Sequence, residues 1–395
     1  MKKNINFLDL GLQPLANNYL NKSQLKKKEK KYRLKVGLNI ETKLVSINKP
    51  LSSKIMFNNK YPYRSAMSKT MLKSFKDLSK LINKKFKPNK ILEIGSNDGS
   101  FIKNFSKKKV IGIEPCSNVE KITKKNGFNT YAKYWNSKTA NKILEKDGKV
   151  DLIYSANTIS HIQNLDEVFQ SINVILSENG ILIIEDPSLL ECLKKNTYDQ
   201  FYNEHIYVFS TIGIENILKK HDFEIFHIQN LSIHGGSNRY FIKKKSNKIK
   251  INLSVKINKK KEIKFGIHKL STYKLFAKRV EKSKKILKKI FQQINLKDQK
   301  IIGYGVTAKS TTILNYCKIG ANLIQYFLDT TKDKQNKYTP GTKIPIYKYS
   351  GSIKKDINFA FLGAWNFKDE IFKKEKKFIK RGGKFIIHTP LPKII

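Results

Sequence analysis

The chain has 395 residues, of which 79 are Lys or Arg and 31 are Asp or Glu, so its formal net charge is +48. This length predicts two or three domains, and a hydrophobic content of 39% supports sizeable cores. Strong basicity favours an anionic partner such as nucleic acid or a membrane. However, the lysines are dispersed, with only local clusters at Lys259–Lys261 and Lys284–Lys289. We therefore interpret the charge mainly as compositional bias and expect neither a specific nucleic acid nor a membrane as partner.

The three cysteines Cys116, Cys192 and Cys317 lie far apart and form no C-x-x-C pair. Neither a zinc site nor a disulfide framework is predicted from them, and such a pattern fits a reducing cytoplasm. Asp9 interrupts the apolar stretch near the start, which argues against a signal peptide. No apolar run approaches the ~18–20 residues that a membrane span needs. We expect a cytoplasmic protein.

The first segment, residues 1–66, is expected to form a small lobe. Gly and Pro punctuate Phe7–Asn17, which predicts an irregular segment. Alternation of apolar and polar residues in Tyr32–Val36 and Leu44–Ile47 predicts a hairpin. An aromatic turn, Tyr61–Ser65, closes the lobe.

The middle segment, residues 67–246, begins with a helical pattern over Met67–Lys84 and then alternates strands with helices. That alternation is the signature of a parallel sheet. The predicted strands are Ile91–Ile94, Val110–Ile113, Phe128–Tyr131, Val150–Tyr154, Gly180–Glu185, Phe223–Gln229 and Asn238–Ile242. The predicted helices between them are 118–126, 137–145 and 165–176. The last two strands have no long helix between them, as in the seven-stranded methyltransferase sheet that closes with an antiparallel strand.

Glycines at the turn after the first of these strands predict a ligand loop, because they let backbone N–H groups approach a ligand closely. The second strand is followed by an acid in the position that commonly accepts hydrogen bonds from ribose hydroxyls. The turn G-S-N-D-G lacks the G-x-G-x-x-G order of a dinucleotide site, and its acidity suits the amino-acid tail and sulfonium of S-adenosylmethionine. An ordinary strand end is the structural alternative. The predicted donor-binding residues are Glu93, Gly95, Ser96, Asn97, Gly99, Glu114 and Asn157.

The last segment, residues 247–395, starts with a lysine-rich helical connector and continues from Gln299 as a second α/β pattern. Its predicted elements are the strand-to-glycine turn Lys300–Gly305, the helix Ala308–Tyr316, and the strands Leu323–Asp329, Ile357–Leu362 and Lys384–Ile387. The expected fold is therefore α/β: a class I methyltransferase Rossmann-like core, a small N-terminal lobe and a C-terminal Rossmann-like domain.

The stretch Tyr202–His205 is the sharpest candidate for chemistry. Methylation of a carbon needs a base that removes a proton next to a carbonyl, and histidine suits such transfer near neutral pH. We expect His205 to be that base in an irregular loop. Glu204 and Tyr202 are expected either to orient the base or to bind the enolate oxygen, and the Glu204 carboxylate to steer the tautomer of the imidazole and raise its pKa. His161, after the fourth strand, is expected to face the same site. A packed polar loop is the structural alternative.

Two glycine-rich turns are candidates for substrate binding. His234 and Arg239 flank the first, where an arginine can clamp phosphate or carboxylate. Gly305 and Lys309 belong to the second, at a helix start equipped for a pyrophosphate. The structural alternatives are a tight turn between strands and an ordinary capped helix.

Several ordered motifs together resemble the sugar C-methyltransferases, which add a branching methyl to nucleotide-linked keto-deoxysugars. They are L-D-L-G-L-Q-P-L-A-N, Y-P-Y-R-S, E-I-G-S-N-D-G, G-I-E-P, A-N-T-I-S-H-I, Y-N-E-H, H-G-G-S and G-Y-G-V-T-A-K-S-T-T. The resemblance covers nearly the whole chain and implies a zinc lobe, a methyltransferase core and a C-terminal domain that helps to hold the nucleotide. It also implies His205 as the base, with Tyr202, Glu204 and His161 nearby, and Tyr63 reaching the sugar.

The chain departs from this family in the lobe. One cysteine pair of the family precedes the L-G-x-x-P-L-A-N stretch, where this chain has only Met1–Phe7 and no cysteine. At the expected places of the second pair stand Asn39 and Thr42, which are not zinc ligands of any strength. We therefore predict no metal.

Three functions stay open on the sequence alone. The first is methyl transfer to a nucleotide-linked sugar, with the sugar, the nucleotide, carbon against oxygen as acceptor, and the oligomeric state undetermined. The second is an RNA methyltransferase that uses the basic surface, although no RNA-binding module is recognisable. The third is a binding protein that keeps the fold without the reaction.

Overall fold

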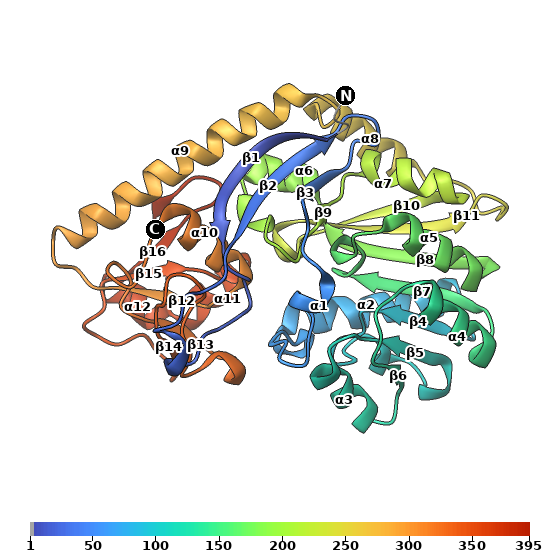
Figure 1. The fold of residues 1–395 in the computed structure, drawn as a ribbon, viewed down its shortest axis with the longest axis horizontal. Coiled ribbons are helices and arrows are strands. Elements are labelled where there is room, and N and C mark those ends of the chain that lie inside the picture. Colours follow the sequence, from blue (N-terminus) through green and yellow to red (C-terminus); the bar gives the residue numbers. More distant parts are fainter. Residues whose placement is uncertain (1–3) are drawn as a thin grey trace.

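The lobe forms the first of three sheets in the computed structural model, which describes residues 4–395 (Figure 1). Its strand order is β1-β2-β3-β9 and all three pairings are antiparallel. The strands are β1 (Asn4–Gln13), β2 (Tyr32–Asn39), β3 (Val45–Asn48) and β9 (Tyr207–Val208). The predicted hairpin is confirmed. Because β9 comes from the middle segment, the lobe is stitched to the core just after the Tyr202–His205 loop.

The expectation of an irregular segment at Phe7–Asn17 is wrong over its first half, which belongs to β1. Register shifts between Asn6 and Leu8 and between Asp9 and Leu12 absorb the glycine that suggested a break. Gly11 takes a φ of +75°, which a bulged strand accommodates.

The core carries the seven-stranded sheet expected from the sequence, in the order β10-β11-β8-β7-β4-β5-β6. Only β11 runs antiparallel to its neighbours. Residues of the central strands are buried on both faces, as parallel strands covered by helices require. The strands are β4 (Ile91–Ile94), β5 (Val110–Ile113), β6 (Asn129–Tyr131), β7 (Val150–Ala156), β8 (Leu176–Pro187), β10 (Phe223–Leu231) and β11 (Ser237–Lys244). This strand order is the class I methyltransferase topology.

The four predicted helices of the core are present, and three short helices that were not predicted accompany them, at Ser53–Met56, Leu189–Lys195 and Thr211–Leu218. They are α1 (Ser53–Met56), α2 (Lys69–Lys85), α3 (Ser117–Lys125), α4 (Ser137–Asp147), α5 (Leu165–Ile175), α6 (Leu189–Lys195) and α7 (Thr211–Leu218). Helix α2 shows why the pattern predicted it well: its core side is apolar, and the Ser68 side chain caps its first turn by accepting from the Met71 N–H.

The C-terminal domain forms the third sheet, in the order β14-β13-β12-β15-β16-β17. All pairs are parallel except β16 with β17. Its strands are β12 (Ile301–Tyr304), β13 (Phe327–Asp329), β14 (Ile346–Lys348), β15 (Phe359–Leu362), β16 (Lys384–Ile387) and β17 (Lys393–Ile394). Its helices are α10 (Ala308–Cys317), α11 (Lys368–Lys374) and α12 (Lys376–Lys380). The predicted second Rossmann-like pattern is confirmed.

The lysine-rich connector consists of α8 (Leu253–Phe265) and α9 (Leu270–Asn295). Helix α8 lies against β10 of the core, whereas α9 contacts both β1 of the lobe and α10. Along Figure 1, α9 crosses from the core side to the C-terminal domain. Its buried stripe, which includes Tyr273, Phe276 and Phe291, shares one hydrophobic cluster with the lobe and the C-terminal domain. The lobe therefore packs between the two larger domains. The domain boundaries proposed after residues 66 and 246 stay a prediction.

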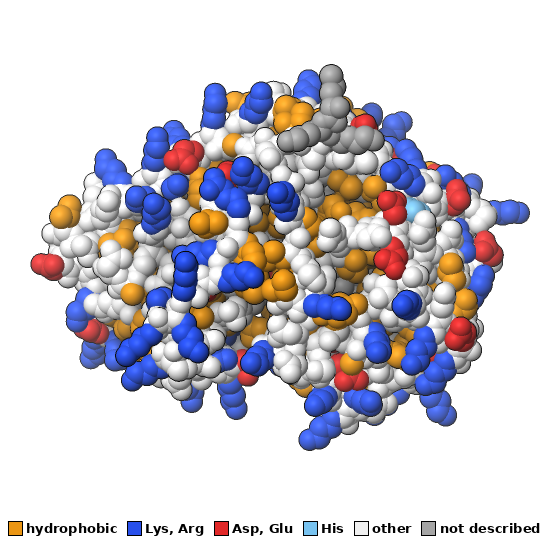
Figure 2. Space-filling model, viewed as in Figure 1, with side chains coloured by type: hydrophobic (Ala, Val, Ile, Leu, Met, Phe, Trp, Pro, Cys, Tyr) orange, Lys and Arg blue, Asp and Glu red, His pale blue; other side chains and the backbone are white. Residues whose placement is uncertain are grey.

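Lysine and arginine side chains are spread over the whole face drawn in Figure 2 and do not gather over one element. This distribution agrees with the dispersed lysines of the sequence. Among residues 4–395, no helix is long and apolar enough to cross a membrane.

The lobe offers poor chemistry for zinc. Residues 1–66 contain neither Cys nor His, and the structure of residues 4–395 shows no group of three or more Cys, His, Asp or Glu side chains that would hold a metal. The Asn39 Oδ1 instead accepts the backbone N–H groups of Glu41 and Thr42, at 3.0 and 2.9 Å. A side-chain turn therefore shapes the tip where the related family is expected to place zinc ligands.

Purified protein is accordingly expected to contain no stoichiometric zinc by elemental analysis. Its melting temperature should not change on addition of a chelator, because no metal contributes to the folding free energy. One zinc ion per chain would contradict this interpretation of the lobe.

Candidate functional site

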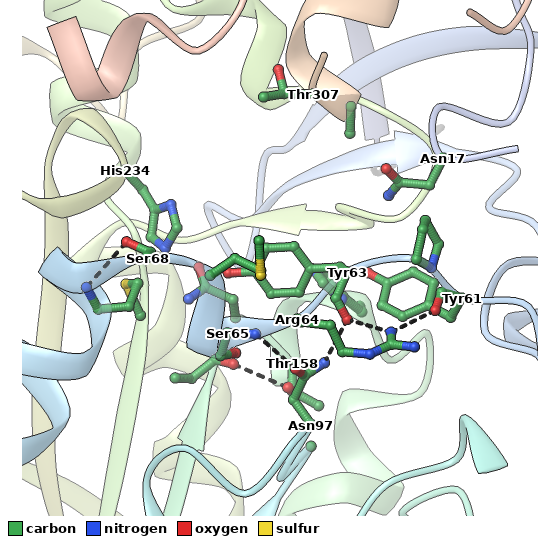
Figure 3. A pocket seen from close by; sticks show the side chains of 18 of the residues that line it. Asn17, Tyr61, Tyr63, Arg64, Ser65, Ser68, Asn97, Thr158, His234 and Thr307 are labelled. Atoms are coloured by element: carbon green, nitrogen blue, oxygen red, sulfur yellow. Dashed lines mark hydrogen bonds between the residues drawn. The ribbon is translucent and has the colours of Figure 1, made fainter. Parts of the chain in front are cut away.

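A cleft of about 770 Å³ lies where the lobe, the core and the C-terminal domain meet. It opens on the carboxyl ends of β4, β5 and β7 and on those of β12 and β13, the edges where parallel sheets bind ligands. Figure 3 shows side chains from the lobe, the core and the C-terminal domain around one cavity. The predicted site residues that line it are Tyr63, Glu93, Gly95, Ser96, Asn97, Glu114, Asn157, His161, Tyr202, His205, His234, Gly305 and Lys309. Gly99, Glu204 and Arg239 do not.

The turn after β4 is shaped by hydrogen bonds to β5 and by glycine. The N–H groups of Gly95 and Ser96 both donate to the Ile113 carbonyl, at 2.8 and 2.9 Å. Gly95 has a φ of +79°, and a Cβ there would lie 2.0 Å from the Thr158 hydroxyl oxygen. The absence of a side chain at Gly95 thus serves packing against the turn after β7, as well as the loop conformation.

Gly99 has a packing role in the turn after β4. Its φ is +74°, and a Cβ there would lie 2.9 Å from the Thr123 side chain. The glycine therefore lets the loop pack against α3; Gly99 does not line the cleft, and its contact with the donor stays a prediction.

Two buried carboxylates stand at the donor end of the cleft. Glu114 Oε1 accepts from the Cys116 N–H at 2.8 Å, and its Oε2 accepts from the Asn97 N–H at 3.0 Å. Glu93 Oε2 and Ser96 Oγ are buried without a hydrogen-bond partner among the described residues. Burial, followed by the nearby Asp98 and Glu114 carboxylates, raises the pKa of Glu93 well above its ordinary value. The unpartnered Ser96 hydroxyl and Glu93 carboxyl lie beside a second acid, Glu114. This set fits a cationic ligand that carries hydroxyl groups, such as S-adenosylmethionine.

The aromatic turn between the lobe and α2 is fixed to the donor loop. Asn97 Oδ1 accepts from the Ser65 N–H, and Asp98 Oδ2 accepts from the Ala66 N–H, each at 2.9 Å. Arg64 donates to the Tyr63 carbonyl at 2.9 Å (Figure 3). These contacts present the Tyr63 ring to the cleft, where 42% of the residue surface is exposed.

Two histidines and a tyrosine lie together at the Tyr202–His205 loop. The Tyr202 hydroxyl lies 2.5 Å from His205 Nε2, and the His161 ring stacks on the His205 ring with centroids 5.0 Å apart. Phe57 in turn stacks on the His161 ring, with ring centroids 5.5 Å apart. The Tyr202 hydroxyl can donate to Nε2 when the neutral imidazole carries its proton on Nδ1. The expected proximity of Tyr202, His161 and His205 is therefore present.

His205 is kept neutral, contrary to the expected direction of its pKa. Burial lowers the pKa of His205 well below 6.5, and the nearby His161, Lys309 and His234 lower it further. Burial also lowers the pKa of His161 and of His234 to about 3. No carboxylate is among the named neighbours in residues 4–395 that shift the pKa of His205. The imidazole is thus available as a base throughout the neutral range.

Glu204 points away from the histidine, so the expectation that it orients the base is wrong. Its Oε1 accepts from the Asn17 amide at 2.7 Å, and its Oε2 accepts from the Tyr61 hydroxyl at 3.0 Å. Burial raises the pKa of Glu204 to about 7. The carboxylate instead fastens the lobe and the aromatic turn to the catalytic loop. Asn17 and Tyr61 lie within motifs that the sequence singled out, yet nothing in their type indicated this partner.

Arg239 is also not a substrate ligand. Its guanidinium is buried on β11 and pairs with Glu185 at 2.6 Å. It donates further to Gln229 at 2.8 Å and to Ser74 at 3.0 Å. Each of its three nitrogens has a partner inside the core, because β11 lies between β10 and β8 and its residues are buried.

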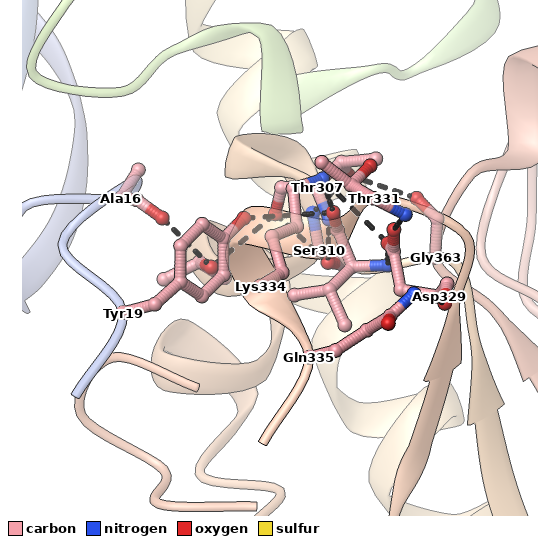
Figure 4. Close-up of polar contacts among 11 residues, drawn as sticks. Ala16, Tyr19, Thr307, Ser310, Asp329, Thr331, Lys334, Gln335 and Gly363 are labelled. Carbon is pink, nitrogen blue, oxygen red and sulfur yellow. Dashed lines mark hydrogen bonds and ion pairs between the residues drawn. The ribbon is translucent and has the colours of Figure 1, made fainter. Parts of the chain in front are cut away.

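The C-terminal side of the cleft repeats the donor-side arrangement around Asp329, at the end of β13 (Figure 4). Asp329 Oδ2 accepts from the Val306 N–H at 2.8 Å, and its Oδ1 accepts from the Thr331 N–H at 2.7 Å. The Gly305 N–H donates to the Leu328 carbonyl at 2.8 Å, as Gly95 does to β5. Asp329 therefore matches Glu114 in position and in bonding. Asp329 was not predicted from the sequence. The available signal was an acid at the end of the second strand of the C-terminal α/β pattern.

Three family models match consecutive parts of the chain. One described as a methyltransferase domain matches residues 63–228, and one described as a C-methyltransferase C-terminal domain matches residues 232–390. A third, described as a zinc binding domain, matches residues 2–57. Its match is to a lobe that here contains neither Cys nor His.

A curated relative supports the same family. C-methyltransferase NovU from Streptomyces niveus is 27% identical over 77% of this chain and 73% of its own length.

Solved structures resemble only part of the chain. An assigned O-methyltransferase from Nostoc punctiforme is 18% identical with a TM-score of 0.34, over 45% of this chain and 57% of that one. Magnesium protoporphyrin IX methyltransferase from Synechocystis, solved with bound S-adenosylmethionine, is 10% identical with a TM-score of 0.33, over 43% of this chain and 78% of that one.

The fold assignment comes from the strand order of the core sheet, and the family from the three consecutive matches together with the relative that matches 77% of this chain. The predicted resemblance is thereby confirmed. The chain belongs to the S-adenosylmethionine-dependent C-methyltransferases.

Proposed function

We propose that the protein methylates a carbon of a nucleotide-linked 4-keto-deoxysugar, through an enolate formed by His205. The observation that carries this proposal is the single cleft with two nucleoside-type ends, one at Glu114 and one at Asp329. An acid at the end of the second strand, held by backbone N–H groups of a glycine turn, suits a ribose in each domain. A donor and a nucleotide-linked acceptor then meet in the middle, where the histidines lie.

The donor end has the residues to hold S-adenosylmethionine. Glu114 would accept from the ribose hydroxyls through the lone pairs that its two backbone donors leave free. Glu93 and Ser96 offer unpartnered buried atoms, and Asn157 lies at the end of β7 on the same edge. When bound, the donor supplies an electrophilic methyl group on a sulfonium.

The chemistry then falls to the chain's own residues. His205 removes the proton from the carbon next to the keto group, the C–H pair forms the new C=C bond, and the carbonyl pair moves onto oxygen. That carbon takes the methyl group while the C–S pair stays on sulfur, and the carbonyl re-forms. Tyr202 holds Nε2 as the acceptor atom before substrate binds, and Tyr63 faces the sugar from the aromatic turn. Tyr202 and Tyr63 stay protonated, because burial raises the pKa of each.

The basic side chains and the cysteines bear on the kind of partner and on the compartment. The partner is a small molecule rather than a specific nucleic acid, because the basic side chains are scattered. Cys116, Cys192 and Cys317 are buried free thiols, which fits a cytoplasmic enzyme of deoxysugar biosynthesis.

Donor binding is expected to release a proton from Glu93. A cationic ligand favours the ionised form of Glu93, whose pKa is raised in the free protein. Calorimetric titration with S-adenosylmethionine in buffers of different ionisation enthalpy measures the released protons directly. Glu93→Gln should abolish most of the release and weaken binding by about tenfold, corresponding to about 1–3 kcal/mol for a lost hydrogen bond to charge. Equal proton release in the variant would show that Glu93 does not meet the donor.

His205→Asn is expected to leave donor affinity unchanged and to lower turnover by about 10²–10⁴-fold, the usual contribution of a general base. The clean readout is solvent-deuterium exchange at the carbon next to the keto group of nucleotide-linked 4-keto-deoxysugars, without donor. Because the pKa of His205 is lowered, wild-type exchange should persist through neutral pH and be lost only well below pH 6.5, as the imidazole becomes protonated.

The matched control is His221→Asn, whose imidazole pairs with Asp166 outside the cleft. It should exchange at the wild-type rate. Wild-type exchange in the His205 variant would remove His205 from its role and make His161 or Tyr63 the leading base.

A further inference from the structure

Lys309 is an unusual cation for its surroundings. It is the second residue of α10, it lines the cleft, and only 8% of the residue is exposed. No residue in 4–395 gives its ammonium a hydrogen bond or an ion pair within 4 Å. A buried ammonium without a protein acceptor is costly, which is accepted where a ligand completes the site. By contrast, Lys334 on the same domain donates to the Val306 carbonyl at 2.6 Å.

A cation–π contact places the Lys309 ammonium beside Trp365. Nζ lies 5.4 Å from the centroid of the Trp365 ring. The Trp365 indole N–H donates to Asp199 Oδ2 at 2.6 Å, and His388 Nε2 lies 3.4 Å from the same oxygen. Asp199 is fully buried and stands three residues before Tyr202.

Trp365 also contacts the turn that carries His234. A Cβ on Gly235 would lie 2.3 Å from that ring, so the backbone beside His234 rests directly on it. The His234 carbonyl accepts from the Gln200 amide at 2.7 Å, which ties this turn to the catalytic loop. Lys309 therefore stands beside Trp365, which Asp199 and the His234 turn connect to the Tyr202–His205 loop, whereas Lys334 lies 3.6 Å from the Asp329 carboxylate.

We propose that Lys309 is a catalytic residue whose ammonium stabilises the developing enolate oxygen of the sugar, and that Asp199 and Trp365 are positioning residues that fix it there. This inference rests on the proposed function and replaces the expectation that Lys309 binds a pyrophosphate. When His205 takes the carbon-bound proton, the carbonyl pair becomes a negative charge on oxygen. A fixed cation beside that oxygen is stronger in the transition state than in the ground state, as catalysis requires.

The surrounding charges support this role. Burial lowers the pKa of Lys309, while the Asp199 carboxylate opposes that effect and favours the ammonium. Burial lowers the pKa of His205 most, and His161, this ammonium and His234 lower it further, so the base stays neutral. Tyr202 is the other group facing the imidazole, and it is uncharged. One cation thereby serves both partners of the proton transfer.

The first test needs no substrate. The His205 imidazole is titrated by NMR in protein labelled at histidine, with His205→Asn identifying its signal. In Lys309→Met, which keeps chain length and removes the charge, the pKa of His205 should rise toward 6.5. Lys334→Met is the matched control and should leave that pKa unchanged. An unchanged His205 pKa in Lys309→Met would overturn the placement of Lys309 beside the base, whatever the substrate is.

The second test measures catalysis on nucleotide-linked 4-keto-deoxysugars. Lys309→Met should lower kcat and the deuterium exchange rate by about 10²–10³-fold, the range for one lost oxyanion donor, with KM changed only a few-fold. Lys309→Arg should recover part of the rate. Asp199→Asn keeps the acceptor for Trp365 and should lower kcat about tenfold.

The outcomes separate the two proposals. A rise in KM with kcat kept would make Lys309 a phosphate clamp and overturn this inference, while the proposed function stands. If no keto-sugar exchanges even in the wild type, the proposed function fails and the inference fails with it, although the NMR result still records the coupling.

Discussion

The buried carboxylate of Glu204 is the contact on which the geometry of the cleft depends. It accepts from Asn17 of the lobe and from Tyr61 of the aromatic turn, within the loop that carries His205. Truncating it would leave both donors unpaired, at about 1–3 kcal/mol for each buried group. Asn97 then ties the same turn to the donor loop. Donor site, base and lobe are thus linked by a short chain of hydrogen bonds, which explains why a small lobe without zinc ligands still belongs to the active site.

The second organising feature is the use of one backbone device in both Rossmann-like domains. Glu114 and Asp329 each accept two backbone N–H groups, one from a glycine turn and one from two residues downstream. The first is buried among carboxylates, whereas Lys334 lies beside the second. The donor end thus suits a cation and the C-terminal end an anion-bearing nucleotide. Helix α9 and the lobe hold the two ends together through one apolar cluster.

Patterns that depend on local chemistry were predictable. The strand-turn-acid of the donor site, the helical stripe of α2 and the grouping of Tyr202 with His205 follow from residue type and spacing. What failed depended on where a strand lies in the sheet. Arg239 was expected in a ligand site, but β11 is internal and its guanidinium meets Glu185.

Long-range partners also escaped the sequence. A carboxylate next to a histidine in sequence need not face it, as Glu204 shows. The direction of the His205 pKa was wrong because its neighbours His234 and Lys309 come from distant segments. A strand was missed at the start of the chain because the bulges of β1 conceal its alternation.

We propose that the methyl donor and the acceptor nucleotide occupy one cleft at the same time, on different domains. A crystal structure of the full chain with S-adenosylhomocysteine and a nucleoside diphosphate tests it most directly. We expect the adenosine ribose at Glu114, the second nucleoside at Asp329, and an open space between them bordered by His205 and Lys309. Mutually exclusive binding of the two ligands, or a nucleoside diphosphate seated outside the cleft, would contradict the account.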